Sequence, residues 1–278
     1  MRCLFALILV LASSSIQAPT ALRIKIAAHS NMPGPRHTLE TSDNTTTYYI
    51  QGPRRRSEWS RFAMLGPMVT IQRCDTHVLY TLSPKRREYM ESSIPSLADL
   101  EKAREQAKQK SNDAPPNLVF EITTVDTGET KQAFGHTAHH YITTTKQTPS
   151  PELGQEPSQT VEDAWYLDMP DVMTCEPVSH RPRGFIGSTF STRVGGLIGT
   201  GHTLPDIRPE FRYTGPEPQG LVLSSKRTTQ SVHVLQTGEK QNAESVLSHE
   251  IIEISEVPID PTLFEVPSDF KKVSQFTK

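Results

Sequence analysis

The sequence predicts a mainly β protein with little helix and many antiparallel strands. Apolar and polar residues alternate along much of the chain, as in residues 22–30 (LRIKIAAHS), and this period of two is typical of strands. Turn signals such as Gly52-Pro53 recur between the alternating stretches. The 22 prolines among 278 residues disfavour long helices.

The first 21 residues are typical of a signal peptide. Arg2 precedes an unbroken apolar run, residues 4–12 (LFALILVLA), and three serines follow. The run has about nine residues, whereas a membrane-spanning helix needs roughly 20. A buried N-terminal strand or helix is the alternative, but no later stretch is so uniformly apolar. We expect cleavage between residues 15 and 21, which leaves a periplasmic or secreted protein without a membrane-spanning segment.

The strands that follow are expected in chain order, mostly as a meander with short turns. They cover residues 22–30, 45–51, 54–64, 69–73, 78–82, 85–91, 118–122, 131–134, 137–146, 160–169, 221–228, 231–236 and 245–256. A turn is predicted at residues 126–129 and an exposed loop at 147–158. Residues 179–218, rich in glycine and proline, are expected to form a long irregular insertion.

Residues 96–110 are the one stretch that predicts a helix. Ser96 and Asp99 have the spacing of a capping box, and a narrow apolar stripe follows. A sheet with one apolar face must bury that face. A helix with so narrow an apolar stripe can cover only an edge of the sheet or the mouth of a barrel. We therefore expect a single domain over residues 22–278. Its fold would be a curled antiparallel sheet or open β-barrel, covered by one or a few helices.

Two cysteines, Cys74 and Cys175, remain once the signal peptide is removed. In an oxidising compartment two cysteines are more often paired than free. A bridge would close a loop of about 100 residues and stabilise the fold by up to roughly 4–5 kcal/mol. Two buried, reduced thiols are the alternative. A zinc site needs more ligands at close spacing than these two residues offer.

The sequence contains no clear catalytic or metal-binding pattern. His136, His139 and His140 form the one histidine cluster, but on a strand His139 points away from the other two, so we expect surface or edge-strand residues. The glycines of residues 195–201 match neither the dinucleotide spacing nor the P-loop. A formal charge of −2 gives no reason to expect nucleic-acid binding. We expect no enzymatic activity, no metal and no cofactor.

Three weaker interpretations concern single groups of residues. A hydrolase would need Glu162, Asp163 and His140 to converge in a cleft. The basic runs at residues 54–56 and 85–87 are expected to protect sheet edges from aggregation, with contact to anionic lipid headgroups as the alternative. Asn44 begins a formal glycosylation signal, which matters only in a eukaryotic secretory path.

Four stretches resemble a family of exported bacterial proteins. They are residues 80–91 (YTLSPKRREYME), 128–141 (GETKQAFGHTAHHY), 164–176 (AWYLDMPDVMTCE) and 260–273 (DPTLFEVPSDFKKV). The family is an uncharacterised, acidobacterial-type group related to the superfamily of the lipoprotein carriers LolA and LolB. The resemblance covers about residues 45–273, and residues 179–218 match it poorly.

This resemblance implies a fold and a disulfide. The relatives have an open, half-curled antiparallel β-barrel around an apolar cavity, closed by helices, and the carriers bind acyl chains there. This sequence differs in having one clear helix where the carriers have several. The family has cysteines at the places of Cys74 and Cys175, which implies a bridge between them. No catalytic residue carries over, because the family has none assigned.

We therefore expect an exported, non-catalytic protein of the cell envelope. Its ligand would be a lipid, a lipoprotein acyl chain or another apolar molecule bound in the cavity of the barrel. The side chains expected on the inward, ligand-binding face are Tyr80, Phe120, Trp165, Leu167 and Ile252, although a filled core would use the same residues. The alternative is an envelope interaction or scaffold module with a solid core and no ligand.

Overall fold

A computed structural model describes residues 20–33, 39–60, 66–96, 98–99, 102, 105, 115–173, 175, 207–234 and 238–276. The predicted signal peptide up to residue 19 lies outside the described residues. So do the glycines of residues 195–201 and most of the predicted segments 96–110 and 179–218.

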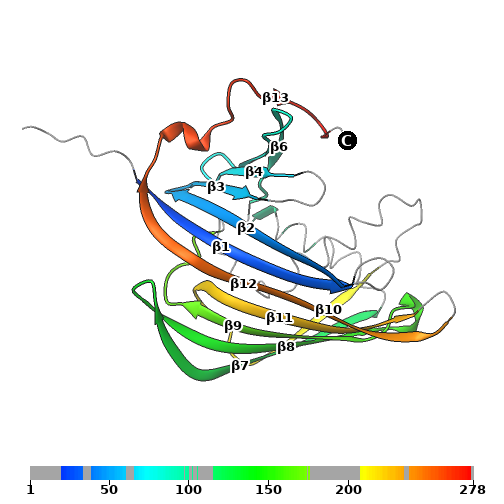
Figure 1. Cartoon of the computed structure of the whole chain (residues 1–278). Coiled ribbons are helices and arrows are strands. Elements are labelled where there is room, and N and C mark those ends of the chain that lie inside the picture. Colours follow the sequence, from blue (N-terminus) through cyan, green and yellow to red (C-terminus); the bar gives the residue numbers. More distant parts are fainter. Residues whose placement is uncertain are drawn as a thin grey trace, which may run out of the picture.

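The described strands form one sheet of thirteen strands, in the order β10-β7-β8-β9-β11-β12-β1-β2-β3-β4-β5-β6-β13. The sheet curls without closing on itself (Figure 1), so it ends in β10 on one side and β13 on the other. The strands are β1 (Thr20–Pro33), β2 (Leu39–Gln51), β3 (Arg54–Trp59), β4 (Met68–Arg73), β5 (Val78–Ser83), β6 (Glu88–Ser93), β7 (Leu118–Ala133), β8 (His136–Pro149), β9 (Ser158–Leu167), β10 (Pro209–Thr214), β11 (Leu221–Val234), β12 (Lys240–Pro258) and β13 (Lys271–Lys272).

This architecture confirms the predicted mainly β class and the predicted antiparallel pairing. The strands β1 to β6 form one meander, and β7 to β9 form another. The long strand β12 joins the two halves, because it pairs with β11 on one side and with β1 on the other. Among the strands that the structure describes, only the terminal ones, β10 and β13, pair in parallel with their neighbours.

The predicted turn at residues 126–129 is wrong, because these residues lie within one continuous strand, β7. The pairing of β7 with β8 shifts between Asp126 and Thr130, which marks a β-bulge. Gly128 has a φ of 76°, and its backbone N–H donates to Asp126 Oδ1 at 2.8 Å. The residues that form this local hydrogen bond are therefore the same whether the strand ends in a turn there or continues through a bulge.

A strand also lies where an irregular segment was predicted. β10 is paired in parallel with the first residues of β7, and Phe211 stacks on Phe120 with ring centroids 4.9 Å apart. Pro209 occupies the first position of β10, a position that an edge strand tolerates. The segments predicted at residues 221–228 and 231–236 form the single strand β11.

The predicted capping box is present at the start of the helical segment. The backbone N–H of Asp99 donates to Ser96 Oγ at 3.2 Å, and the backbone N–H of Ser96 donates to Asp99 Oδ2 at 3.2 Å. Residues 98–99, 102 and 105 are helical. No α-helix covers the sheet among the described residues, so the predicted helical cover is not seen in this part of the chain.

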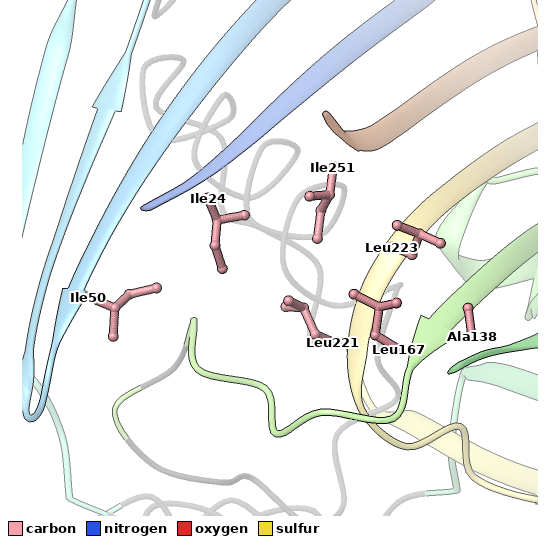
Figure 2. Close-up of a cluster of buried hydrophobic side chains, with 7 residues drawn as sticks. All are labelled: Ile24, Ile50, Ala138, Leu167, Leu221, Leu223 and Ile251. Carbon is pink, nitrogen blue, oxygen red and sulfur yellow. The ribbon is translucent and has the colours of Figure 1, made fainter. Parts of the chain in front are cut away.

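One apolar core lies on the face toward which the sheet curls, called the inner face here. Its fully buried members come from β1, β2, β8, β9, β11 and β12, and we call them the inner cluster: Ile24, Ile50, Ala138, Leu167, Leu221, Leu223 and Ile251. Figure 2 shows these side chains pointing toward one another from the surrounding strands. Strands from both halves of the sheet thus share one core.

A second core lies on the opposite, outer face of the same strands. Neighbouring residues of a strand point to opposite faces, so Tyr49 faces outward where Ile50 faces inward. The outer cluster is Ala21, Val69, Ile71, Leu82 and Phe264. Phe264 belongs to a short 3-10 helix, η5 (Pro261–Phe264), which lies outside the curl in Figure 1. The C-terminal segment therefore covers the outer face of β1 to β5.

Candidate functional site

The inner face is crossed by a short segment that follows β9, with described residues 168–173 and 175, which we call the strap. At its start the backbone N–H of Asp168 donates to the Thr137 carbonyl at 2.8 Å, and the N–H of Leu221 donates to the Met169 carbonyl at 3.0 Å. Further on, Met169, Val172 and Met173 pack against the inner cluster. Thioether side chains adapt to irregular apolar surfaces, so this cover is well suited to reshaping.

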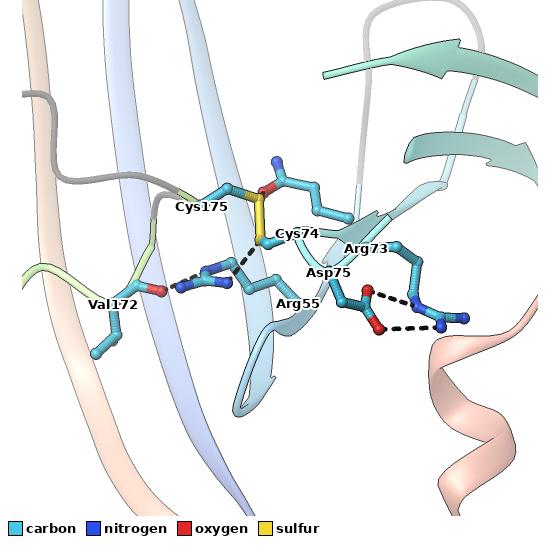
Figure 3. Close-up of a disulfide and its surroundings, with 7 residues drawn as sticks. Arg55, Arg73, Cys74, Asp75, Val172 and Cys175 are labelled. Carbon is cyan, nitrogen blue, oxygen red and sulfur yellow. Dashed lines mark hydrogen bonds and ion pairs between the residues drawn. A yellow bond between two sulfur atoms is a disulfide. The ribbon is translucent and has the colours of Figure 1, made fainter. Parts of the chain in front are cut away.

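A disulfide attaches the far end of the strap to the sheet. Cys175 is bonded to Cys74 in the turn after β4, and their Cα atoms lie 5.3 Å apart across 101 residues of sequence (Figure 3). This confirms the predicted pairing of the two cysteines. Disulfides persist in oxidising compartments and are rare in reducing ones.

Arg55 reinforces this attachment on the inner face. Its Nε donates to the Val172 carbonyl at 2.8 Å, and a terminal guanidinium nitrogen donates to Cys74 Sγ at 2.8 Å (Figure 3). Burial lowers the pKa of Arg55, and the nearby charge of Asp171 opposes that effect. One side chain thus bonds to both the strap and the bridge that holds it.

The adjacent Arg56 bonds in the corresponding way to the segment that covers the outer face. A terminal guanidinium nitrogen donates to the Leu263 carbonyl at 2.9 Å, and Nε donates to Glu58 at 2.7 Å. The prediction that residues 54–56 shield a sheet edge is therefore wrong, because β3 lies between β2 and β4. Two successive arginines instead hold the two segments that cover opposite faces.

Along β1 and β12 the inner face changes from apolar to polar. Ile26 pairs with Ile251, and two residues further along β1, on the same face, Ala28 pairs with His249. His249 Nδ1 lies 3.2 Å from Ser225 Oγ on β11. Beyond this pair the surface is charged and hydroxylated, so the inner face as a whole is amphipathic.

The next row of the polar part is an ion pair. Arg227 donates to Glu162 at 3.1 Å, with only 15% and 10% of the two side chains exposed. One row further, the Thr160 and Thr229 hydroxyls lie 3.0 Å apart. Burial lowers the pKa of His249, with a smaller upward effect of Glu162 and a smaller downward effect of Arg227, so this imidazole is neutral at pH 7.

Two open grooves lie along strands β9, β11 and β12. One, of about 580 Å³, is lined mainly by a row of paired residues, Ala27, Glu250, Ser224 and Trp165, and by their neighbours on the same face, which is opposite to that of His249. The other, of about 600 Å³, includes Ser158, Ser231 and Ala243, which form a row of paired residues across β9, β11 and β12. Both volumes lie within the range of small-molecule sites.

The five residues predicted to bind a ligand do not gather at one place. Leu167 belongs to the inner cluster, and Trp165 packs against it. Phe120 lies in a separate cluster with Leu118 and Ile122. Tyr80 packs against the outer cluster, on the opposite face of the sheet.

Ile252 was expected on the inward face, but 52% of it is exposed. The pairing of β1 with β12 passes from Ile251 to Glu253, so Ile252 is the extra residue of a bulge. The apolar residues of the strap were not predicted as site residues. The position of Cys175 just after Met173 was the signal that could have found them, because a bridge at Cys175 brings its neighbours onto the sheet.

His140 is not the surface residue that we expected, because it lies on the interior strand β8 and is only 8% exposed. Its Nε2 lies 2.9 Å from Asp163, and its ring stacks on Trp165 with centroids 4.7 Å apart. Glu162 points to the opposite face of β9, toward Arg227. The trio required for the hydrolase interpretation is therefore not assembled. No group of three possible metal ligands occurs among the residues that the structure describes.

Comparison with known proteins assigns no family. No family model matches the sequence, and no curated protein matches it. Among solved structures, a DUF1329 family protein from Desulfovibrio piger aligns over 90% of this chain and 91% of its own, with 9% identity and a TM-score of 0.27. The resemblance to an acidobacterial-type family stays a prediction. Within the described part of the chain, no helix has the length and apolar character needed to span a membrane.

Replacing both bridge cysteines, as Cys74→Ser with Cys175→Ser, should release the strap and lower the free energy of unfolding by about 2–5 kcal/mol. Limited proteolysis should then cut within residues 168–175 before it cuts the strands. A matched control is Ser92→Ala on β6, an exposed residue outside the strap and the bridge. If the double variant is as stable and as resistant to proteolysis as the parent, the bridge does not hold the strap.

Proposed function

We propose that the chain is an exported protein of the cell envelope, and that it holds a lipid or another apolar ligand on the inner face of its curled sheet. The observation that carries this proposal is the strap. It is anchored at Asp168 by main-chain bonds and at Cys175 by the disulfide, while Met169, Val172 and Met173 between these anchors rest on the inner cluster. The stretch between these anchors can lift once Arg55 releases the Val172 carbonyl, while both ends stay attached.

Two further features support a lipid-like ligand in an exported protein. The disulfide fits an oxidising compartment, and the first residues have the pattern of a signal peptide. The inner face is apolar around Ile251 and polar from His249 onward, which suits a molecule with an apolar chain and a polar end. A wholly apolar ligand would leave the polar part without a role.

The alternative function is an envelope interaction or scaffold module with a solid core. The complete burial of Ile24 and Leu167 favours it, because these side chains already fill the space beneath the strap. The two functions differ in one property. In a ligand-binding protein the methionines of the strap must move aside when the ligand enters, whereas in a scaffold they must stay packed on the inner cluster.

Ligand binding is tested on protein exported by its own leader and purified without detergent. Native mass spectrometry should find a co-purifying lipid, and the delipidated protein should take up a fluorescent fatty acid. Met173→Trp, which overfills the space under the strap, should weaken this uptake about tenfold. The matched control Met90→Trp on β6, outside the inner cluster, should leave uptake unchanged. Absence of both lipid and uptake would support the scaffold.

Export is tested by the position of the mature N-terminus. Thr20 and Ala21 already pair with Pro258 and Val257 of β12, and Ala21 is buried in the outer cluster. Cleavage after Ser15 or Ala18 preserves these pairs, whereas cleavage after Ala21 removes them. The intact mass of the exported protein should therefore place its first residue before Thr20. An uncut chain that stays in the cytoplasm would contradict export.

A further inference from the structure

The edge strand β10 offers one of its sides to a further strand. Among the strands that the structure describes, β10 pairs with β7 on one side and with none on the other. The N–H of Asn117, just before β7, donates to the Arg208 carbonyl at 3.1 Å, so this carbonyl points toward β7. Backbone groups alternate in direction along a strand. Glu210 therefore bonds toward β7, whereas Pro209 and Phe211 present their backbone groups at the open edge.

The middle of this edge is able to pair with another strand. Edge strands are commonly protected by bulges, prolines or charged side chains. The pairing of β10 with β7 runs from Pro209 to Thr214 without a bulge, and the one proline of β10 stands at its first position. In the middle of the strand, the backbone of Phe211 can both donate and accept a hydrogen bond across the edge.

The two charged side chains of β10 are complementary to those of a second, antiparallel copy. Glu210 and Arg212 flank Phe211 and point to one face of the strand. With Phe211 opposite Phe211, Glu210 of each copy lies directly opposite Arg212 of the other, and such opposite-charge pairs stabilise a sheet. Sliding one strand by two residues places Glu210 opposite Glu210 or Arg212 opposite Arg212, and these pairs repel. The charges therefore favour one register.

Both charged side chains lie at the surface, where they can exchange partners. Arg212 Nε donates to Glu210 at 2.9 Å within the strand, and another nitrogen of Arg212 lies 3.7 Å from Glu121 on β7. The side chains of Arg212 and Glu210 are 55% and 38% exposed. Because both remain in contact with water, pairing across a new edge requires little desolvation.

The aromatic side chains on the other face of β10 favour the same register. Phe211 pairs with Phe120 on β7, and the two rings stack with centroids 4.9 Å apart. Phe211 is only half-buried. With a second copy in the register above, the two Phe211 side chains lie next to each other, which extends the row of rings across four strands and removes more apolar surface from water.

We propose that two copies of the chain associate through β10, antiparallel about a two-fold axis at Phe211, so that their sheets join into one. The partner is a second copy of this chain because the edge is complementary to itself, both in its charges and in its central side chain. The contact uses six residues of each chain, so the dimer is weak and reversible. This inference goes beyond the proposed ligand binding and does not depend on it.

The first test is the mass of the exported full chain in solution, measured by sedimentation equilibrium. The average mass should rise from that of a monomer toward that of a dimer as the concentration increases from about 10 μM to about 1 mM. A monomer at every concentration would overturn the proposal and leave β10 to a different partner. A contact about a two-fold axis is complete with two copies, so larger assemblies would overturn it as well.

Charge reversal tests the register. Glu210→Arg and Arg212→Glu each place like charges opposite each other at two sites of the dimer, so each should raise the dissociation constant about tenfold. The combined variant, Glu210→Arg with Arg212→Glu, restores both opposite-charge pairs and should return the constant to within about threefold of the parent value. If the combined variant associates as weakly as the single ones, β10 does not pair in this register.

The matched control lies at the opposite end of the sheet. Lys272 on β13 forms an ion pair of 2.8 Å with Glu91 on β6, and 57% of the Lys272 side chain is exposed. Lys272→Glu changes the net charge as much as Arg212→Glu does, and it should leave the dissociation constant unchanged. An equal loss of association in both variants would show that net charge governs the dimer, and would overturn the assignment to β10.

Engineered cysteines measure the position of the two-fold axis independently. Phe211→Cys places two cysteines opposite each other, with Cα atoms about 5.5 Å apart, which is within disulfide range. Tyr213→Cys places them four residue positions apart, about 13 Å, which is too far. Mild oxidation should therefore link only the first variant into a covalent dimer. Equal linking of both variants, or a parent dimer in which neither is linked, would contradict an axis at Phe211.

Discussion

The structure depends on covering both faces of a single curled sheet with segments that the strands themselves do not supply. In β1 and β2 the inner side chains Ile24 and Ile50 and the outer side chains Ala21 and Tyr49 are all apolar or aromatic, so neither face can be left to water. Two successive arginines of β3 hold the covering segments on the two faces. Arg55 bonds to the strap on the inner face, and Arg56 bonds to the C-terminal segment on the outer face.

The strap on the inner face and the C-terminal segment on the outer face are attached differently, and this difference underlies the proposed function. The outer cover inserts Phe264, a fully buried side chain, into its cluster, as a permanent part of a core does. The inner cover contributes flexible methionines and is held at its far end by a disulfide and an arginine. Beside it the inner face continues into the polar residues His249 and Ser225 and a buried ion pair. An amphipathic surface with an adaptable cover is the arrangement that a lipid-like ligand requires.

Local features of the sequence predicted local features of the fold. The alternation of residues 22–30 predicted β1, Ser96 and Asp99 predicted their capping box, and the two cysteines predicted their bridge. Long-range features had no local signal. Nothing near Leu118 indicates that Pro209 begins its parallel neighbour, because that pairing depends on residues far along the chain. Alternation with a period of two shows which side chains of a strand share a face, but it does not show which face is the inner one. Tyr80 was therefore assigned to the wrong face. One extra residue at a bulge reverses the alternation, which is why Ile252 is exposed.

The separate roles of the two arginines can be tested by hydrogen exchange on the variants Arg55→Gln and Arg56→Gln. Each variant is the control for the other. The account predicts that the Arg55 variant speeds amide exchange in residues 168–173 and leaves residues 259–266 unchanged. The Arg56 variant should show the reverse. Equal acceleration of both segments in both variants, or of neither, would contradict the claim that each arginine holds the cover on its own face of the sheet.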